Sequence, residues 1–245
     1  MKCVIFAHGS VGQLIVQHVV AEYRDDIGAV VTVGEDEVWE AAKRGGVPCR
    51  VFEDTPEFIQ FLQRLHADWG ILAWWPKIVK SHIRAVTKHG FLNTHPSLLP
   101  YNRGKHPNFW SIVEGVPFGV TLHLVDDGVD TGDIVAQREI PYGWCDTGES
   151  LYAKGLAHMY ELFRQTYPKL RVGNLEPERQ DGTVATFHKA AELDGASRID
   201  LNGTYTARHL LNVMRARTFP GHPACWFEDQ GDTFEVTVTI KKRGM

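Results

Sequence analysis

The chain has 245 residues, 43% of them hydrophobic, which is typical of one globular domain or of one domain with a small appendage. Its formal net charge of -4 excludes a global attraction for nucleic-acid backbones, so nucleic-acid binding is not expected. The four cysteines form no CxxC pair, which argues against a disulfide framework and a structural zinc site. No apolar run approaches the roughly 18 residues of a membrane span, and we expect a cytoplasmic protein that does not bind membranes.

The first part of the chain alternates between apolar runs and amphipathic stretches. Apolar runs of strand length occupy residues 3–7, 27–33, 49–51 and 70–74. Stretches with helical periodicity follow them at residues 11–23, 36–43, 55–66 and 77–89, and Thr55 is expected to cap the third. This alternation is typical of βαβ units, so we predict a mainly parallel sheet.

Further elements are predicted from residue 90 onward. A short apolar segment, residues 90–92, is expected to end a strand. After it we predict a helix at 106–114, strands at 119–125 and 133–140, and a long helix from 147 to about 170. Asp146 or Thr147 would cap this long helix, and Gly173 and Pro177 would end it.

The end of the chain differs in character. Residues 186–192 are expected to be irregular or edge structure, residues 206–217 a helix, and residues 224–227 and 233–240 a hairpin. We place a domain boundary between residues 175 and 176, so that residues 1–175 form a catalytic domain and 176–245 an appendage. The predicted fold class is α/β, with a Rossmann-like, mainly parallel sheet flanked by helices and a small α+β appendage.

Three polar groups with catalytic chemistry follow two of the predicted strands. Asn93 and His95 come after segment 90–92, and Asp130 stands 35 residues beyond His95. An amide can hold a carbonyl oxygen, an imidazole can exchange a proton near neutral pH, and a carboxylate can orient the imidazole. Ordinary turn formation is the alternative for these residue types. Since ligands bind at the carboxyl ends of the strands in such sheets, we expect both segments to open on one edge.

Rival motifs in the same region fail on spacing. The acidic run that begins at Asp126 has Gly128 at its third position and Gln137 at its twelfth, which excludes a calcium-binding EF-hand loop. The histidines at 95, 106 and 123 lack zinc-site spacing, so no metal is expected. Gly9-Ser-Val-Gly12 is only part of a dinucleotide-binding fingerprint.

Four motifs together resemble the formyltransferases that use N10-formyltetrahydrofolate. They are Asn93-Thr-His95-Pro-Ser-Leu-Leu-Pro, Asn102-Arg-Gly104, Gly119-Val-Thr-Leu-His123, and Val129-Asp130-Thr-Gly-Asp-Ile134-Val-Ala-Gln137. The resemblance covers residues 1–170 as a fold and is most specific from 91 to 137. It implies that Asn93, His95 and Asp130 are catalytic and that N10-formyltetrahydrofolate is the co-substrate. It also implies a folate site built from Trp75, Lys77, Ile78, Val79, Val125, Asp126 and Asp127, for which ordinary packing is the alternative.

The chemistry of formyl transfer suits these residue types. Attack of a neutral amine on the formyl carbon develops an oxyanion, to which Asn93 and protonated His95 can donate hydrogen bonds. Asp130 would orient the imidazole and favour its protonated form. His95 or a bound water would then move a proton from the attacking nitrogen to the departing folate nitrogen, and no metal is required.

The acceptor amine is predicted from a narrower resemblance. The chain length and the segments 101–110 and 215–220 are similar to sugar N-formyltransferases that act on nucleotide-linked amino deoxysugars. This implies a dTDP- or GDP-linked 4-amino-4,6-dideoxyhexose as substrate, a homodimer, and a role in lipopolysaccharide O-antigen synthesis. The candidate acceptor contacts are Asn102, Arg103, Lys105, Asn108 and His123.

Other acceptors remain open at this point. Glycinamide ribonucleotide is one, and a folate-binding sensor without turnover is another possibility. The methionine of initiator tRNA is less favoured, because a tRNA enzyme of this family is expected to carry a larger basic C-terminal domain.

Overall fold

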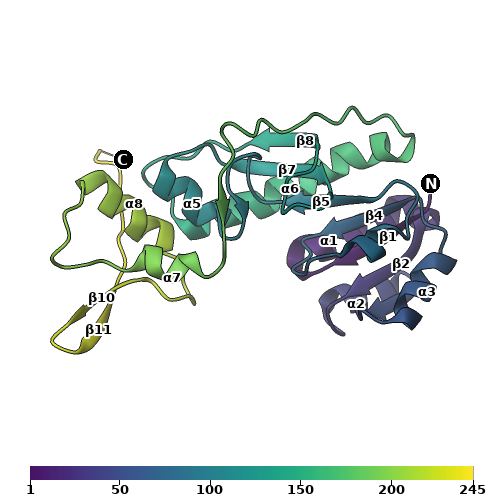
Figure 1. The fold of residues 1–245 in the computed structure, drawn as a ribbon, viewed down its shortest axis with the longest axis horizontal. Coiled ribbons are helices and arrows are strands. Elements are labelled where there is room, and N and C mark those ends of the chain that lie inside the picture. The colour runs from purple at the N-terminus through teal and green to yellow at the C-terminus, as the bar shows by residue number, and fades with distance from the viewer. Residues whose placement is uncertain (245) are drawn as a thin grey trace. The chain divides into compact units, whose positions relative to one another are not determined.

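A seven-stranded sheet forms the centre of the fold in the computed structural model, which describes residues 1–244 (Figure 1). The strands are β1 (Cys3–Ala7), β2 (Ile27–Thr32), β3 (Cys49–Val51), β4 (Trp69–Ala73), β5 (Phe91–His95), β7 (Gly119–Leu124) and β8 (Ile134–Glu139). Their order is β3-β2-β1-β4-β5-β7-β8. The first five pair in parallel, and β7 pairs antiparallel with β5. The predicted Rossmann-like, mainly parallel sheet is therefore confirmed.

Helices connect the strands, and local sequence sets where several of them begin. They are α1 (Gly9–Tyr23), α2 (Glu37–Arg44), α3 (Pro56–Arg64), α4 (Ser81–Arg84), α5 (Pro107–Glu114) and α6 (Gly148–Arg171). The Asp36 carboxylate accepts hydrogen bonds from the N–H groups of Val38 and Trp39 in the first turn of α2. Thr55 caps α3 as predicted, since its hydroxyl accepts from the N–H of Phe58 and a proline follows it.

The predicted helix at residues 77–89 is wrong over most of its length, because α4 is a single turn. The apolar periodicity that suggested the helix is real, since Val79 and Ile83 are both buried. Side chains take over the backbone bonds that a longer helix would make: Arg84 donates to the carbonyl of Val79, and the Thr87 hydroxyl lies within hydrogen-bond distance of the carbonyls of Arg84 and Gly90.

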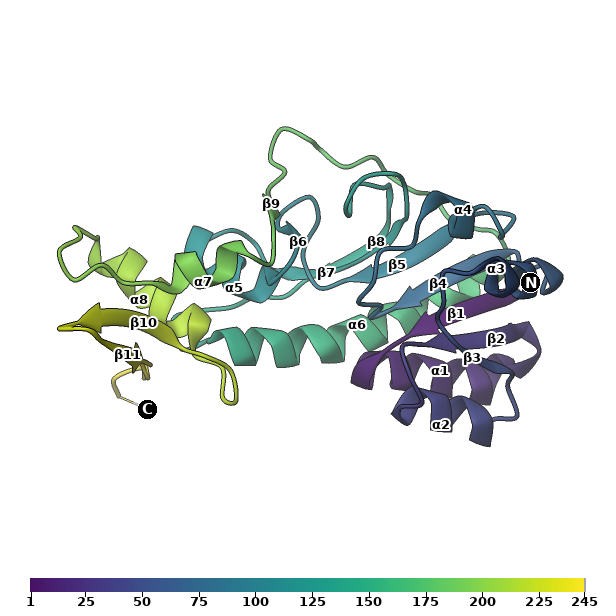
Figure 2. The same ribbon diagram turned by 60° about the horizontal axis from the view of Figure 1, so that its bottom comes forward.

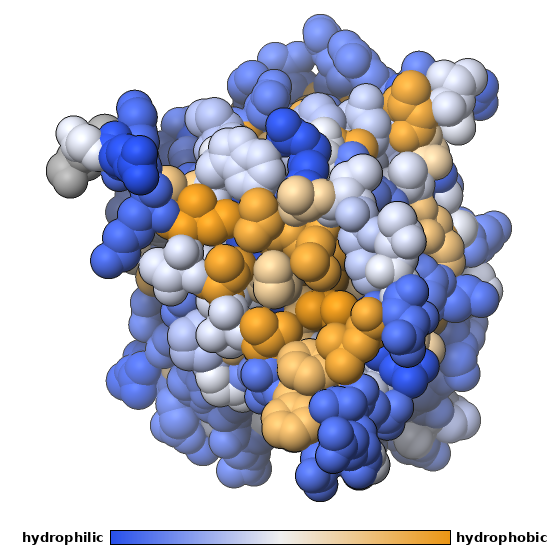
Figure 3. Space-filling model, turned by 90° about the vertical axis from the view of Figure 1, so that its left-hand side faces the viewer, coloured by the Kyte–Doolittle hydropathy of each residue, from blue (hydrophilic) through white to orange (hydrophobic). Residues whose placement is uncertain are grey.

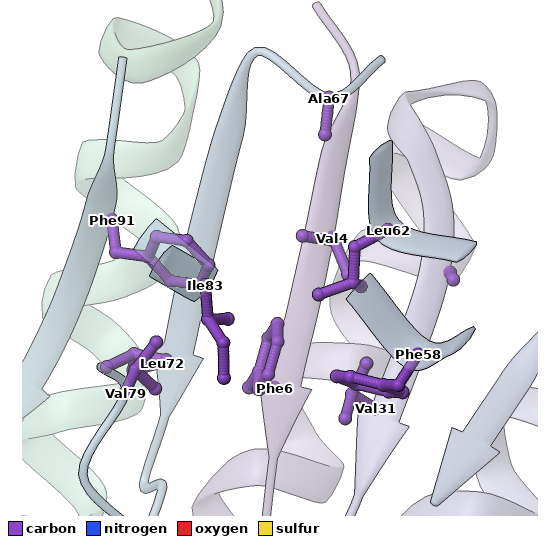
Figure 4. Packing of buried hydrophobic residues seen from close by; sticks show 11 residues of the cluster. Val4, Phe6, Val31, Phe58, Leu62, Ala67, Leu72, Val79, Ile83 and Phe91 are labelled. Atoms are coloured by element: carbon purple, nitrogen blue, oxygen red, sulfur yellow. The ribbon is translucent and has the colours of Figure 1, made fainter. Parts of the chain in front are cut away.

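One face of the sheet packs against α3 and α4. Figure 4 shows this core, in which strand and helix side chains interdigitate around Phe6. The labelled residues are Val4, Phe6, Val31, Phe58, Leu62, Ala67, Leu72, Val79, Ile83 and Phe91. The ring of Phe6 lies edge-on to those of Phe58 and Phe91, with centroids 6.5 Å and 5.4 Å away. Each such side chain contributes roughly 1.5–3 kcal/mol on burial, which holds β5 firmly in the sheet.

Helix α6 runs along the other face of the sheet, beneath β5 and β7 in Figure 2. Its C-terminal end is tied to the residue before β2. The buried carboxylate of Asp26 accepts hydrogen bonds from the Tyr167 hydroxyl at 3.1 Å and from Arg171 Nε at 2.6 Å. A buried charge that is paired and doubly hydrogen-bonded in this way fixes the register of the helix on the sheet.

The chain divides into two compact units, and neither is a continuous stretch. Unit 1 comprises residues 1–95, 121–137 and 156–180, and unit 2 comprises the remainder. Strands β7 and β8 and helix α6 each pass from one unit to the other. We predicted a division of the sequence at residue 175, whereas each of these units combines separate stretches of the sequence. The predicted division stays a prediction.

Unit 2 holds α5, the short strand β6 and the C-terminal elements. Besides α5, they are β6 (Arg103–Gly104), β9 (Phe187–His188), α7 (Glu192–Ser197), α8 (Ala207–Arg217), β10 (Cys225–Asp229) and β11 (Asp232–Val236). The predicted hairpin is confirmed; Gln230 and Gly231 both have positive φ, as a tight type I′ turn requires. Helix α7 was not predicted, because its six residues are too few to show a period. Among residues 1–244, no helix combines the length and apolar character needed to cross a bilayer.

Candidate active site

Strand β5 places Asn93 and His95 side by side. Successive strand residues point to opposite faces, so both share the face of Phe91, which is part of the core. Thr94 points the other way, where its hydroxyl donates to the Leu72 carbonyl and accepts from the Trp74 N–H. We predicted that the strand would end at residue 92; it continues to His95, because Asn93 and His95 also pair with β7.

The loop of residues 125–133 brings Asp130 to these two side chains. Its carboxylate lies 3.4 Å from His95 Nδ1, 3.5 Å from His123 Nε2 and 3.4 Å from Asn93 Nδ2. All three ionisable side chains are nearly buried, with 6% of His95, 2% of His123 and 14% of Asp130 exposed. The expected meeting of the amide, the imidazole and the carboxylate is thus observed.

The route by which they meet differs from the prediction. Because β7 is antiparallel to β5, its end lies beside the start of β5, where the Val125 N–H donates to the carbonyl of Phe91. The two segments therefore do not leave the sheet at the same edge, and that expectation is wrong. The loop folds back along β5 instead, and Asp130 adopts a φ of 54° that is uncommon for a residue other than glycine.

Short-range contacts set the path of this loop. The Asp126 carboxylate accepts from the Gly128 N–H at 3.1 Å and from the Thr131 hydroxyl at 2.6 Å, as in an Asx turn. Gly132 passes so close to the strand that a Cβ atom there would stand 1.9 Å from the Leu124 carbonyl oxygen. Only glycine fits at that position, so the turn after Asp130 has little freedom.

His123 belongs to the same cluster. It lies directly opposite Asn93 in the β5–β7 register, so their side chains share a face. Its Nδ1 is 2.7 Å from the carbonyl oxygen of Leu124, and since a carbonyl can only accept, this nitrogen carries a proton. In the neutral ring Nε2 is then the acceptor for Asn93 Nδ2, at 3.1 Å. We predicted that His123 contacts the substrate that accepts the formyl group. In the structure it is a neighbour that orients Asn93, and its contact with substrate stays a prediction.

The first predicted folate-binding segment is partly core and partly exposed. Trp75 packs edge-on against Phe6 and Phe52, with centroids 5.3 Å and 5.4 Å away, and its buried Nε1 has no hydrogen-bond partner among residues 1–244. Lys77 Nζ lies 5.2 Å from the centroid of the Phe52 ring. Val79 is buried, whereas Ile78 is 80% exposed.

Arg84 joins the two predicted folate-binding segments, although nothing in the sequence singled it out. One guanidinium nitrogen donates to the Val79 carbonyl at 3.0 Å, and another bonds the carboxylate of Asp127. In the residues that follow Val79 in sequence, the side chains of Lys80 and His82 form hydrogen bonds with the Asp54 carboxylate and lower its pKa. The segments 75–80 and 125–127 are therefore cross-linked by side chains that a sequence pattern does not reveal.

The predicted acceptor contacts in unit 2 are less uniform. Asn102 is fully buried, and its side-chain amide lies 2.9 Å from the Ser111 hydroxyl and 3.2 Å from the Thr186 hydroxyl, which favours a structural role. Asn108 Nδ2 donates to the Gly148 carbonyl, joining the starts of α5 and α6. The N–H groups of Arg103 and Lys105 donate to the carbonyls of Thr186 and His188. Because these are bonds of the backbone, they do not test the role of the two cationic side chains, which stays a prediction.

Within residues 1–244, no group of three or more His, Cys, Asp or Glu side chains has the arrangement of a metal site. The cluster of Asn93, His95, His123 and Asp130 contains an imidazole held by a carboxylate, next to an amide held by a second imidazole. This arrangement can stabilise negative charge on an oxygen and move a proton.

Residues 1–166 match the formyl transferase family. The chain belongs to this family. Residues 192–242 match a second family, the N-formyltransferase dimerization C-terminal domain. The resemblance inferred from the four motifs is thereby confirmed.

Two relatives show how this formyltransferase compares with proteins of assigned activity. It is 35% identical over 185 residues to dTDP-4-amino-4,6-dideoxyglucose formyltransferase of Mycobacterium tuberculosis, which covers 75% of this chain and 76% of the relative. It is 33% identical over 187 residues to methionyl-tRNA formyltransferase of Thermodesulfovibrio yellowstonii. That second match covers 75% of this chain but only 59% of the relative.

Solved structures extend the similarity to the whole fold. A Mycobacterium tuberculosis protein grouped with the sugar N-formyltransferases superposes with a TM-score of 0.83 at 25% identity, covering all of this chain and 99% of its own. The formyltransferase PseJ of Anoxybacillus kamchatkensis superposes with a TM-score of 0.61 at 25% identity, covering 80% of this chain and 89% of its own. The PseJ structure holds UDP-4,6-dideoxy-4-formamido-L-AltNAc and tetrahydrofolate.

Proposed function

We propose that this formyltransferase moves the formyl group of N10-formyltetrahydrofolate to the amine of a nucleotide-linked amino deoxysugar. The observation that carries the proposal is that the folded-back loop places the Asp130 carboxylate 3.4 Å from both Asn93 Nδ2 and His95 Nδ1 on β5. The acceptor class is supported by the match to the dTDP-amino-sugar enzyme, which covers three quarters of both chains, and by the nucleotide sugar bound to PseJ. Cytoplasmic location and a role in O-antigen synthesis stay predictions.

His95 is the proton-transfer group in this scheme. Because Nδ1 faces the Asp130 carboxylate at 3.4 Å, the carboxylate favours the protonated ring and fixes its orientation. The other ring nitrogen, Nε2, lies across the ring from Asp130. It donates a hydrogen bond to the formyl oxygen as negative charge develops there.

Asn93 is the second donor to that oxygen, and its present contacts show what must change. Its amide nitrogen has two hydrogens and two partners, His123 Nε2 at 3.1 Å and Asp130 Oδ1 at 3.4 Å. The contact with Asp130 is the longer, so this hydrogen is the one that bonds the formyl oxygen in place of Asp130 when substrate binds. His123 keeps the other hydrogen and thereby holds the amide plane.

The reaction then balances without a further reagent. The lone pair of the sugar amine forms a bond to the formyl carbon, and the tetrahedral intermediate breaks the bond between that carbon and folate N10. Protonated His95 gives a proton to N10 as that bond breaks, and the ring then takes up the proton lost by the amine, directly or through a water. The products are the N-formylated sugar and tetrahydrofolate.

A second acceptor is favoured by one observation, the 33% identity to methionyl-tRNA formyltransferase. That match leaves about two fifths of the tRNA enzyme without a counterpart, while the match to the sugar enzyme leaves about one quarter. Formyl transfer to methionyl-tRNA or to glycinamide ribonucleotide is therefore an outcome to test. Formyl transfer to a sugar amine is the function that the observations support best.

A panel assay decides among these acceptors. The purified protein is incubated with N10-formyltetrahydrofolate and dTDP-, GDP- or UDP-linked amino sugars, glycinamide ribonucleotide or methionyl-tRNA. Tetrahydrofolate release and the mass of the formylated product are measured. We expect transfer to at least one nucleotide sugar, and His95→Asn and Asp130→Asn should each lower kcat on the order of 100- to 1,000-fold.

The control for this assay is His89→Asn, at an exposed histidine of unit 1 that packs against Trp69. It should retain the wild-type rate. Transfer only to tRNA or glycinamide ribonucleotide would refute the sugar acceptor. Folate binding without turnover on any amine, unchanged by His95→Asn, would identify a folate sensor instead.

We further propose that the protein is a homodimer formed through its C-terminal segment. Residues 192–242 match a dimerization domain. In this segment Leu201, Tyr205 and Phe234 are 54%, 38% and 45% exposed. Figure 3 shows hydrophobic side chains gathered into a patch with a hydrophilic border on the side that carries the C-terminal elements of unit 2. An exposed apolar patch of this kind is typical of a protein interface.

A further inference from the structure

The segment that follows α6, where we placed the domain boundary, pairs with the sheet. The N–H of Ile134 donates to the Glu178 carbonyl at 2.7 Å, and the N–H of Glu178 donates back to the Ile134 carbonyl at 2.8 Å. This short bridge lies at the start of β8, immediately after the loop that carries Asp130. It brings Gln180 to Asp130 in that loop, although these two residues are 50 positions apart in sequence.

The Gln180 side chain bonds the loop at two points. Its Nε2 donates to the carbonyl oxygen of Asp130 at 2.9 Å and to that of Gly132 at 2.7 Å. A primary amide has two hydrogens, and both are used on carbonyls that stand two residues apart. Fixing these carbonyls fixes the peptide planes after Asp130 and after Gly132, and so limits rotation of the backbone that aims the Asp130 side chain.

The two halves of the loop are held by different means. Asp126 holds the first half through its bonds to Gly128 and Thr131. Asp130 itself has a φ of 54°, a conformation that an aspartate keeps only when its surroundings determine it. Asp126 bonds the residues on either side of Asp130 but not Asp130 itself, whereas Gln180 bonds the carbonyls of Asp130 and Gly132 directly.

We propose that Gln180 is a positioning residue for formyl transfer, one that holds Asp130 where its carboxylate faces His95. Gln180 acts through the backbone of Asp130 and Gly132. The proposal rests on the proposed function, because its main readout is the rate of transfer. Gln180 therefore belongs to the catalytic apparatus of unit 1, although it lies in the segment that we predicted to be the start of the appendage.

Two substitutions test the role of the amide. Gln180→Met keeps the length of the side chain and removes both hydrogens. Gln180→Glu keeps the shape and turns a carboxylate toward two carbonyl oxygens at neutral pH. We expect kcat to fall on the order of 10-fold in the first variant, because a displaced catalytic group loses rate steeply, and further in the second. KM for folate and for the amino sugar should stay within about twofold, since Gln180 is not proposed to contact either.

The pH dependence separates positioning from a general loss of stability. In Gln180→Glu the introduced carboxyl can donate one hydrogen only when it is protonated, so the rate relative to wild type should rise as the pH is lowered from 8 to 5. A structural defect has no reason to reverse with acid. The control is Glu178→Gln, in the same segment, whose bonds to the sheet come from its backbone and whose side chain is exposed. It should retain wild-type kinetics at every pH.

An NMR titration of the His95 ring makes the test independent of the acceptor. In wild-type protein without substrates, the Asp130 carboxylate favours the protonated ring, so loosening it should move the His95 titration midpoint to lower pH in Gln180→Met. If the wild type formylates no amine but this shift is seen, the proposed function fails and the role of Gln180 stands. If Gln180→Met keeps both the wild-type kcat and the His95 midpoint, with or without a lower melting temperature, the positioning role is refuted.

Discussion

Burial controls the reactivity of individual side chains, and the four cysteines show this most directly. Cys3 in β1 and Cys225 in β10 are fully buried, whereas Cys145 is exposed. Burial raises the pKa of Cys3 and of Cys225 to about 12. Burial also raises the pKa of the half-buried Cys49. Because the thiolate is the reactive form, the four thiols should differ widely in their rates of alkylation.

Alkylation of the folded protein tests this order. At pH 8 a thiol with a pKa near 12 is ionised in roughly one molecule in ten thousand. Iodoacetamide should therefore modify Cys145 first and Cys49 more slowly, and it should reach Cys3 and Cys225 only after denaturation. Peptide mass mapping at timed intervals measures the order, and Cys145→Ser should remove the fast phase. Equal rates at Cys3 and Cys145 would contradict the burial seen here.

At the scale of one element, the start of α6 is stabilised by a network of side chains. The Thr147 hydroxyl accepts from the Ser150 N–H at 3.2 Å, and the Ser150 hydroxyl accepts from the Thr147 N–H at 2.9 Å, which is a reciprocal capping box. The Asp146 carboxylate accepts from Lys154 and from the Gly143 N–H, at 2.7 Å and 2.8 Å. The predicted cap at Asp146 or Thr147 is confirmed, and both residues take part.

The contribution of Asp146 to stability should depend on pH. Burial alone would raise the pKa of Asp146, but hydrogen bonds from Lys154, Gly143 and Ser150 outweigh it and lower the pKa. A carboxyl group whose pKa is lowered on folding stabilises the protein above its unfolded pKa, near 3.8, and loses this effect as the pH falls through its folded value. Asp146→Asn should therefore destabilise the fold by at most about 1 kcal/mol at pH 7.

Urea unfolding of both proteins at several pH values checks this expectation. The difference in the free energy of unfolding between wild type and Asp146→Asn should be present at pH 7 and should shrink below pH 4. A difference that stays constant from pH 7 to pH 3 would show that the charge of Asp146 contributes nothing. Thr147→Ala is a useful comparison, because its cost of about 1 kcal/mol should not vary with pH.

For the whole molecule, the apolar surface of the C-terminal segment is the feature that an isolated chain leaves unexplained. Leu201 and Phe234 are about half exposed, and residues 192–242 match a dimerization domain. Moving such side chains out of water on association would stabilise a dimer by roughly 25 cal/mol for each Å² of apolar surface buried. A charge placed on the surface would have to be desolvated on association and should oppose it.

Sedimentation velocity tests the proposed dimer. The wild type should sediment as a dimer, and the double variant Leu201→Glu with Phe234→Glu should sediment as a monomer. Val172→Glu is the matched control, since Val172 is 76% exposed but lies outside the matched segment. A monomeric wild type would refute the proposed dimer. A dimeric double variant would show that the interface lies elsewhere.

Most elements of the fold could be predicted from local pattern, and the failures have specific causes. The parallel strands are short apolar runs, and the long helix α6 shows a clear period and carries a recognisable cap. The predicted helix at 77–89 failed because side chains of Arg84 and Thr87 replace the backbone ladder. Helix α7 is too short to have a period. The segment 176–180 looked like a connection because a single bridge to β8 leaves no repeating pattern.

The candidate residues Asn93, His95 and Asp130 could be selected from the chain alone, because they stand in recognisable motifs and carry the chemical groups that formyl transfer needs. How these groups meet was not readable. Strand register and the direction of pairing depend on which distant surfaces bury one another, and local periodicity carries no information about that. The antiparallel β7 therefore put His123 opposite Asn93, the folded-back loop put Asp130 against His95, and the bridge to β8 put Gln180 behind Asp130. Only the folded chain reveals these three contacts.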